Sequence, residues 1–320
     1  MPGSMGPLKD DFEQRFGFSP WAALLLLLLA MVLGSGIGNG IGFLISHLQG
    51  VSVTGLIATF NEQSSLEERN LLRAFNFFAH LFTFALPAIF VSLVLYRSDW
   101  WRFLKLGRLP SLNFITAGVF FLLGIFGVSQ LAYWLNQQIP LPDWATDMEG
   151  SAGRLVKGLL VMKSPAELLF TLLVVAVLPA IGEELVFRGI LQQKLEQVSH
   201  KPVAAIWITA LIFSAFHLQF AGLLPRLLLG AGLGYLFYWS RSLWPPIIAH
   251  FFVNGLQVAA QYFKSQELPE ASLQDVNWMG ITVSAVLVAA LSFYLYQHRT
   301  ITVPVDEEAN ANQPAVTDEP

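Results

Sequence analysis

Two adjacent carboxylates, Glu183 and Glu184, and the guanidinium of Arg188 stand in the stretch LPAIGEELVFRGIL, residues 178–191. A charge at the centre of a membrane helix costs about 2.5–3.5 kcal/mol on insertion scales, so three in an apolar stretch need a reason. Glu184 and Arg188 are four residues apart, which favours an ion pair on one helix face. Glu183 points about 100° away from that face and has no local partner. An interhelical packing network is the alternative, and the unpaired Glu183 argues against it.

Two other apolar segments carry polar residues at helical spacing. The segment FSAFH places Phe213 and His217 on one helix face, and HFFVN does the same for His250 and Asn254. A lone histidine in a membrane span is more often a packing hydrogen-bonder than a catalyst, so these residues do chemistry only if they meet in space. At about 1.5 Å per residue, Glu183 and these polar residues lie about 10–22 Å from the presumed cytoplasmic helix ends, in one layer of the membrane.

The chemistry that fits an acid, two imidazoles and an amide is hydrolysis of an amide bond by activated water. A carboxylate or imidazole can deprotonate water and then protonate the leaving nitrogen. His250 and Asn254 can donate hydrogen bonds to the oxyanion that forms. Zinc held by Glu183, His217 and His250 is the alternative. The spacing is not H-E-x-x-H, so no cofactor is firmly implied.

Composition places these residues in a membrane protein. Of the 320 residues, 54% are hydrophobic and 12% are charged, whereas a soluble chain has about 25% charged residues. The net charge of −4 offers no basic surface for nucleic acid. The hydrophobic composition makes the lipid bilayer one expected partner, and the hydrolytic chemistry makes a peptide or protein substrate at the membrane the other. The absence of cysteine excludes disulfides, thiol nucleophiles and Cys-ligated zinc.

The hydropathy pattern predicts an all-α polytopic protein with about eight transmembrane helices. A segment of about 20 apolar residues crosses the roughly 30 Å hydrocarbon core. The active site would be buried between helices four, five and seven. Five glycines in the first segment suit either close helix packing or a flexible helix. The eight segments are 20–48, 72–96, 112–135, 166–191, 203–220, 222–239, 244–262 and 278–297.

The distribution of Lys and Arg near the helix ends predicts that both termini are cytoplasmic, with the protein in the cell membrane. The bias depends mainly on the basic loop at 97–108. The chain then divides into five parts: a cytoplasmic N-terminal segment (1–19), N-terminal transmembrane helices and loops (20–165), a catalytic core (166–262), the last loop and helix (263–299) and a disordered acidic tail (300–320).

The three motifs resemble those of the CPBP family, which holds the type II CAAX prenyl endopeptidases and the bacteriocin-processing or immunity (Abi) proteins. The motifs are E-E-x-x-x-R, F-x-x-x-H and H-x-x-x-N, in that order, and the resemblance covers about residues 166–262. It implies a multi-pass, all-helical intramembrane protease that hydrolyses a peptide bond of a membrane-associated peptide or protein. The family contains both proteins labelled metalloproteases and metal-independent glutamate proteases. Neither substrate nor prenylation carries over.

The resemblance also implies roles for individual residues. Glu183 and His217 would activate water, and His250 and Asn254 would form the oxyanion site. The remaining motif residues would hold the architecture: Glu184 and Arg188 as an ion pair, and Phe213 by packing.

A non-catalytic membrane transporter or peptide-binding scaffold is the alternative function. Buried Glu and His residues can carry protons, but the sequence shows no inverted repeat. Asn76 and His80 also lie four residues apart, in the second segment. Helix packing is the preferred interpretation for them, and a contribution to a cavity is the alternative.

Overall fold

The computed structural model describes residues 18–264 and 277–300, and every regular element in these ranges is a helix. The predicted all-α class is therefore confirmed. The expected disordered tail and most of the expected N-terminal segment lie outside the described residues. The helices, including the π-helical and 3-10 segments (η), are α2 (Pro20–Leu48), α3 (Val53–Thr59), α4 (Leu66–His80), η1 (Leu81–Ala85), α5 (Leu86–Tyr96), η2 (Arg97–Asp99), α6 (Trp100–Phe103), α7 (Leu112–Gln137), α8 (Asp143–Leu159), α9 (Pro165–Leu172), η3 (Leu173–Val177), α10 (Leu178–Val186), η4 (Phe187–Gln192), α11 (Gln193–Ser199), α12 (Pro202–Phe216), η5 (Phe220–Gly222), α13 (Leu223–Ser240), α14 (Trp244–Lys264) and α15 (Trp278–Gln297).

Six helical stretches within the described residues are long and apolar enough to cross a membrane, so the chain is a multi-pass membrane protein. They correspond to six of the eight predicted segments. The other two, 203–220 and 244–262, form α12 and α14. Helix α12 is apolar but only 15 residues long. Whether α12 and α14 cross the bilayer stays a prediction. The six stretches are Pro20–Leu48, Leu66–Phe103, Leu112–Gln137, Pro165–Ser199, Phe220–Ser240 and Trp278–Gln297.

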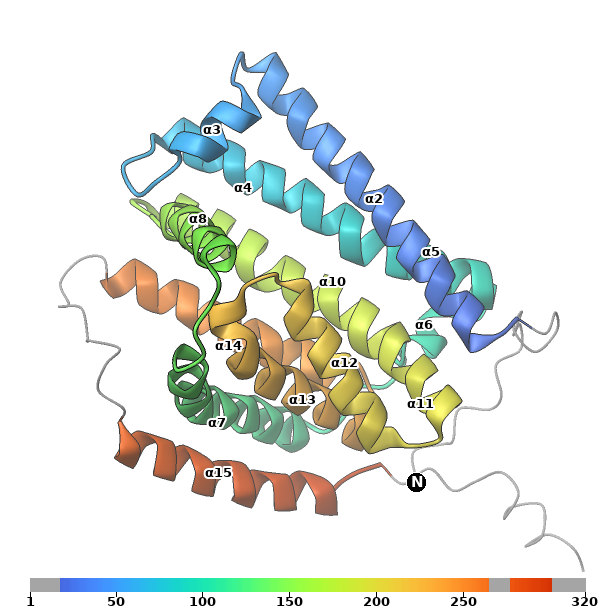
Figure 1. Ribbon diagram of the computed structural model, residues 1–320. Coiled ribbons are helices and arrows are strands. Elements are labelled where there is room, and N and C mark those ends of the chain that lie inside the picture. Colours follow the sequence, from blue (N-terminus) through green and yellow to red (C-terminus); the bar gives the residue numbers. More distant parts are fainter. Residues whose placement is uncertain (1–17, 265–276, 301–320) are drawn as a thin grey trace, which may run out of the picture.

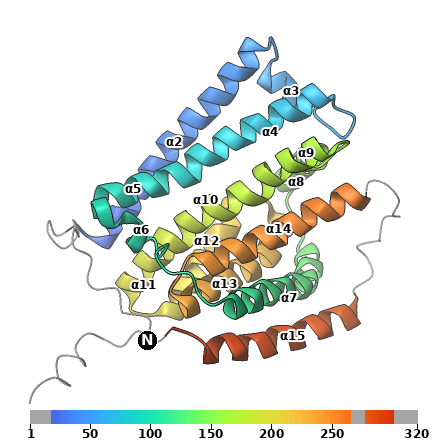
Figure 2. The same cartoon turned by 180° about the vertical axis from the view of Figure 1, so that it is seen from behind.

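The helices pack side by side, with α2 at one edge of the bundle and α15 at the opposite edge (Figure 1, Figure 2). Helix α2 packs on α4, η1 and α5, and α15 packs on α7. Helix α10 lies between these edges, in contact with η1 on one side and α14 on the other. Because α10 carries Glu183, this residue faces neighbours that are far away in the sequence.

The glycines of α2 fall on two faces with different surroundings. A Cβ atom added at Gly34 would lie 1.9 Å from the backbone oxygen of Phe82, and one at Gly38 would lie 2.6 Å from that of Phe78. Added Cβ atoms at Gly36 and Gly40 would meet nothing within 4 Å. Close packing is therefore the correct alternative for the face of α2 with Gly34 and Gly38, where its backbone lies directly against the backbone of residues 78–82.

Wide π-helical turns flank the residues of interest on two helices. His80 directly precedes η1, and Glu183 lies in α10 between η3 and η4. Pro179 has no N–H group to donate to the carbonyl of Val175, four residues earlier. Single π-helical turns within α-helices are frequent at functional sites. A π-helical turn contains more residues than an α-helical turn, so η3 changes the direction in which the later side chains of the same helix, including Glu183, project.

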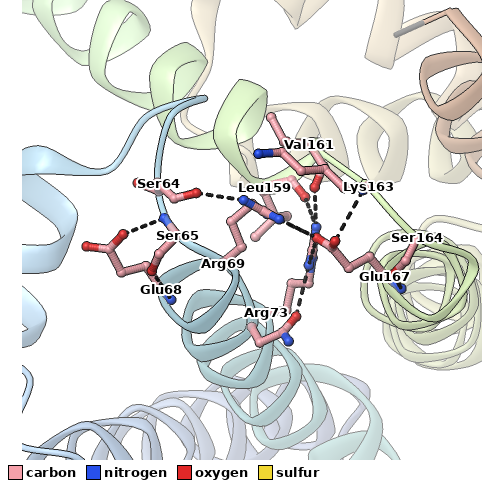
Figure 3. Close-up of polar contacts among 11 residues, drawn as sticks. Ser64, Ser65, Glu68, Arg69, Arg73, Leu159, Val161, Lys163, Ser164 and Glu167 are labelled. Atoms are coloured by element: carbon pink, nitrogen blue, oxygen red, sulfur yellow. Dashed lines mark hydrogen bonds and ion pairs between the residues drawn. The ribbon is translucent and has the colours of Figure 1, made fainter. Parts of the chain in front are cut away.

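A buried cluster of charges fastens α4 to α9 and to the end of α8 (Figure 3). Arg69 and Arg73 donate to the same Glu167 oxygen at 2.8 and 3.1 Å. Arg73 also donates to the backbone oxygens of Leu159 and Val161, at 3.1 and 2.6 Å. Helix α9 continues through η3 into α10, which carries Glu183. The cluster therefore holds the helix of Glu183 against α4.

Candidate active site

The four predicted catalytic residues line one cavity. It has a volume of about 590 Å³ and lies between α4, α7, α8, α10, α12, α13 and α14. Glu183, His217, His250 and Asn254 all contribute to its wall. Helix α4, which lies outside the expected catalytic core, contributes two further polar residues, Asn76 and His80.

Glu183 has imidazoles near both carboxylate oxygens. Its Oε1 lies 3.1 Å from Nε2 of His80, and its Oε2 lies 3.9 Å from Nε2 of His250. Glu183 and His250 are both buried, at 7% exposure. The structure therefore agrees with the alternative for His80, a contribution to a cavity, because its ring lines the cavity and contacts the acid.

His80 is held in this position by its neighbours. Its ring stacks on that of Phe84, with centroids 4.5 Å apart. A Cβ atom added at Gly182 would lie 3.3 Å from Cε1 of His80, so the missing side chain lets α4 and η1 approach α10. The sequence contained one signal for His80, namely a polar pair with Asn76 at a spacing of four in an apolar span.

Glu184 connects Arg188 to His250. Arg188 Nη1 donates to Glu184 Oε1 at 2.8 Å, and Nδ1 of His250 lies 2.9 Å from the same oxygen. Arg188 Nη2 donates to the backbone oxygen of Gly230 at 2.7 Å. Because an ionised carboxylate only accepts hydrogen bonds, Nδ1 of His250 carries the hydrogen and Nε2 faces the cavity side. Glu184 and Arg188 are both fully buried, so this pair orients a ring as well as neutralising charge.

His217 lies at the C-terminal end of α12 and is the most open of the four predicted catalytic residues. Its Nδ1 lies 2.9 Å from the backbone oxygen of Phe213, and this carbonyl can only accept. Nε2 is therefore free of that bond. No ring nitrogen of His217 lies within 4.0 Å of a Glu183 oxygen. The two residues line the same cavity without forming an ion pair.

Asn254 contacts the backbone of the helix that carries Glu183. Its Nδ2 donates to the oxygen of Val175 at 3.3 Å. That oxygen lacks its usual helical donor because residue 179 is proline. The amide has two N–H bonds, so one remains for another acceptor. Asn254 therefore supports the broken helix and also lines the cavity.

Phe213 packs among the other motif residues. Its buried ring makes edge contacts with His217 and His250, at centroid distances of 5.1 and 6.2 Å. The guanidinium carbon of Arg188 lies 4.9 Å from the same ring centroid. The aromatic side chain thus separates the buried ion pair from the cavity and fixes two imidazoles.

The zinc alternative is not matched by the arrangement of the donors. Nε2 of His80 and Nε2 of His250 approach different oxygens of Glu183, and no ring nitrogen of His217 lies within 4.0 Å of either oxygen. In the part of the chain that the structure describes, no three His, Cys, Asp or Glu side chains converge so as to hold an ion. No catalytic step below is therefore assigned to a metal.

One comparison with known proteins gives a match, and it covers the part of the chain that carries the three motifs. A family model described as type II CAAX prenyl endopeptidase Rce1-like matches residues 165–256. No curated protein and no solved structure matches the chain. The matched stretch runs from α9 into α14 and includes all three motifs, whereas His80 lies outside it. Residues 165–256 are therefore similar to the Rce1-like type II CAAX prenyl endopeptidases, in agreement with the resemblance of the three motifs.

Proposed function

We propose that this protein is an intramembrane endopeptidase that hydrolyses a peptide bond of a membrane-associated peptide or protein, using water activated at Glu183. One observation carries the proposal. A buried carboxylate has an imidazole near each oxygen, in a cavity that is also lined by His217 and Asn254. The matching family model, which describes endopeptidases, supports this reaction class.

The proposed reaction begins with a water molecule between Glu183 and His217. Its proton moves to Glu183 as its oxygen forms a bond to the peptide carbonyl carbon. The carbonyl oxygen becomes an oxyanion. The carbon–nitrogen bond then breaks, and the proton passes to the leaving nitrogen, which gives an acid and an amine.

His250 and Asn254 are the proposed oxyanion donors. Nδ1–H of His250 is directed to Glu184, so Nε2 donates only when the ring is an imidazolium. Asn254 has one N–H bond left after its contact with Val175. Each such donor contributes about 10²–10³ in rate.

The test compares hydrolysis by the wild type and by Glu183→Gln, purified in lipid nanodiscs. The first substrate is an internally quenched peptide that ends in a prenylated CAAX sequence. Membrane peptides from cells with either form, compared by mass spectrometry, extend the search to other substrates. Glu196→Gln is the matched control, because Glu196 forms an ion pair with Arg241 away from the cavity.

Loss of cleavage in Glu183→Gln, with cleavage retained in Glu196→Gln, is the expected result. Equal cleavage by the wild type and Glu183→Gln would show that Glu183 is not the base. If Glu183→Gln abolishes solute or proton flux while no peptide differs between the two cell types, the protein is a transporter.

A further inference from the structure

A permanently charged group that is not one of the predicted catalytic residues lies in the cavity wall. Arg226, on the first turn of α13, lines the cavity together with Gln219 and Gly222. Its Nη1 donates to Gln219 Oε1 at 3.0 Å, and its Nη2 donates to the backbone oxygen of Gln219. Its Nε is buried and has no hydrogen-bond partner. The guanidinium is thus held in place with donors to spare.

The partners of Arg226 do not balance its charge. Gln219 offers only neutral oxygens. In residues 18–264 and 277–300, no carboxylate oxygen lies within 4.0 Å of a nitrogen of Arg226. Glu149 on α8, the acid whose charge acts on Arg226, instead accepts the N–H of Ala221 at 2.9 Å. Other buried arginines of this chain differ, because Arg188 and the pair in Figure 3 have carboxylate partners.

The place of Arg226 on α13 is defined relative to the buried ion pair. Gly230, one turn further along α13, accepts the hydrogen bond of Arg188 at 2.7 Å. Four helical residues correspond to about 6 Å, so Arg226 lies about one turn along α13 from the level of the Glu184–Arg188 pair. Glu183 and Arg226 line the same cavity, and no other carboxylate or guanidinium is in its wall. The described cavity therefore has one acid and one permanent cation.

We propose that Arg226 is a substrate-binding residue for a carboxylate group of the peptide, placed a few residues from the bond that is hydrolysed. A guanidinium binds a carboxylate through charge-assisted and often paired hydrogen bonds. In a partly desolvated cavity such a partner removes the cost of an uncompensated charge. The carboxylate belongs either to the C-terminus of the peptide or to an acidic side chain. This proposal rests on the proposed function in one respect, because the peptide is called a substrate only if the protein hydrolyses it.

A purely structural role for Arg226 predicts a different result. Its bonds to Gln219 hold the segment that follows His217, in which Leu218 adopts a positive φ of 51°. If this support were its only role, its loss would weaken the binding of every peptide equally. A carboxylate-binding role instead predicts that its loss affects only peptides that carry the carboxylate.

The experiment measures peptide binding to protein that does not hydrolyse, so it is independent of turnover. Glu183→Gln protein in nanodiscs is titrated with three fluorescent pools of hydrophobic heptapeptides. One pool ends in a free carboxylate, one in an amide, and one in an amide with a glutamate at an internal position. The same titrations are made after adding Arg226→Gln, Arg226→Lys or, as a matched control, Arg154→Gln on the exposed face of α8.

We expect at least one carboxylate-bearing pool to bind about 10- to 100-fold more tightly than the neutral amide pool. Which pool does so identifies the source of the carboxylate. Arg226→Gln should remove this preference, Arg226→Lys should retain part of it, and Arg154→Gln should leave it unchanged. Equal binding of all three pools, including no binding by any of them, would overturn the proposal, as would an equal loss for all pools in Arg226→Gln. Hydrolysis by the wild type tests the proposed function separately.

Discussion

Nε2 of His80 lies 3.1 Å from Oε1 of Glu183, although 103 positions separate the two residues in the chain. His80 is outside residues 165–256, which match the family model. The contact adds a third imidazole to the cavity, beside those of His217 and His250. Its other ring nitrogen, Nδ1, is buried without a hydrogen-bond partner, so Glu183 is the polar group that holds this ring.

Replacement of His80 should therefore impair hydrolysis. We expect His80→Gln to lower kcat about 10²- to 10⁴-fold, the usual range for a group that assists proton transfer. The measurement is cleavage of the peptide identified with the wild type. His298→Gln, which changes an exposed histidine stacked on Tyr294, is the control. A His80→Gln protein with the kcat of the control would show that the contact is only packing.

Glu184 should be needed for folding as well as for activity. Glu184→Gln removes the charge that Arg188 and His250 both contact, and so leaves a buried guanidinium without its counter-ion. Breaking a buried pair in this way costs about 3–5 kcal/mol. Thermal unfolding of purified protein should show a clear loss of stability, whereas Glu183→Gln should stay near the wild type. Equal melting temperatures for Glu184→Gln and the wild type would contradict this role.

The two glycine faces of α2 should respond differently to alanine. Gly34→Ala places a methyl group on the backbone of Phe82 and should cost about 1–3 kcal/mol, or lower the yield of folded protein. Gly36→Ala meets open space and should be neutral or stabilising by up to about 1 kcal/mol, since alanine favours helix. The measurement is thermal stability in matched detergent. The opposite ranking of these two variants would show that α2 packs differently.

The metal question has a direct chemical test. The donors do not converge on one point, so purified active enzyme should keep its activity after treatment with chelator and dialysis. Elemental analysis beside His217→Ala measures any bound zinc. Stoichiometric zinc that is lost in the variant, with activity restored to stripped wild type only by metal, would require the side chains to rearrange around an ion.

The proposed orientation predicts which loops are accessible from outside the cell. The chain has no cysteine, so single cysteines report position without background. Leu109→Cys lies in the exposed basic loop between α6 and α7 and should react with an impermeant reagent only after permeabilisation. Asp147→Cys on the exposed face of α8, across α7 from that loop, should react in intact cells. Reversed labelling would invert the topology and place the termini outside.

Local features of the sequence were sufficient to predict the all-helical class and the three motifs. Apolar length predicted the six stretches that are long enough to cross a membrane, and a spacing of four residues predicted that Glu184 and Arg188 share a face. These inferences succeed because a helix places residues three or four apart side by side whatever surrounds it. The spacing of the alternate glycines likewise defined a face of α2, but left open whether another helix packs on it.

The tertiary structure decided which polar groups share the cavity. The contact between His80 and Glu183, and the bond from Asn254 to Val175 across 79 positions, depend on how closely neighbouring helices approach. That approach is set by missing side chains, by a proline that frees a carbonyl and by wide helical turns. Each of these features produces a contact between side chains only when a second helix lies alongside. The sequence therefore determined the chemical groups available to this protein, and packing between helices determined which of them meet.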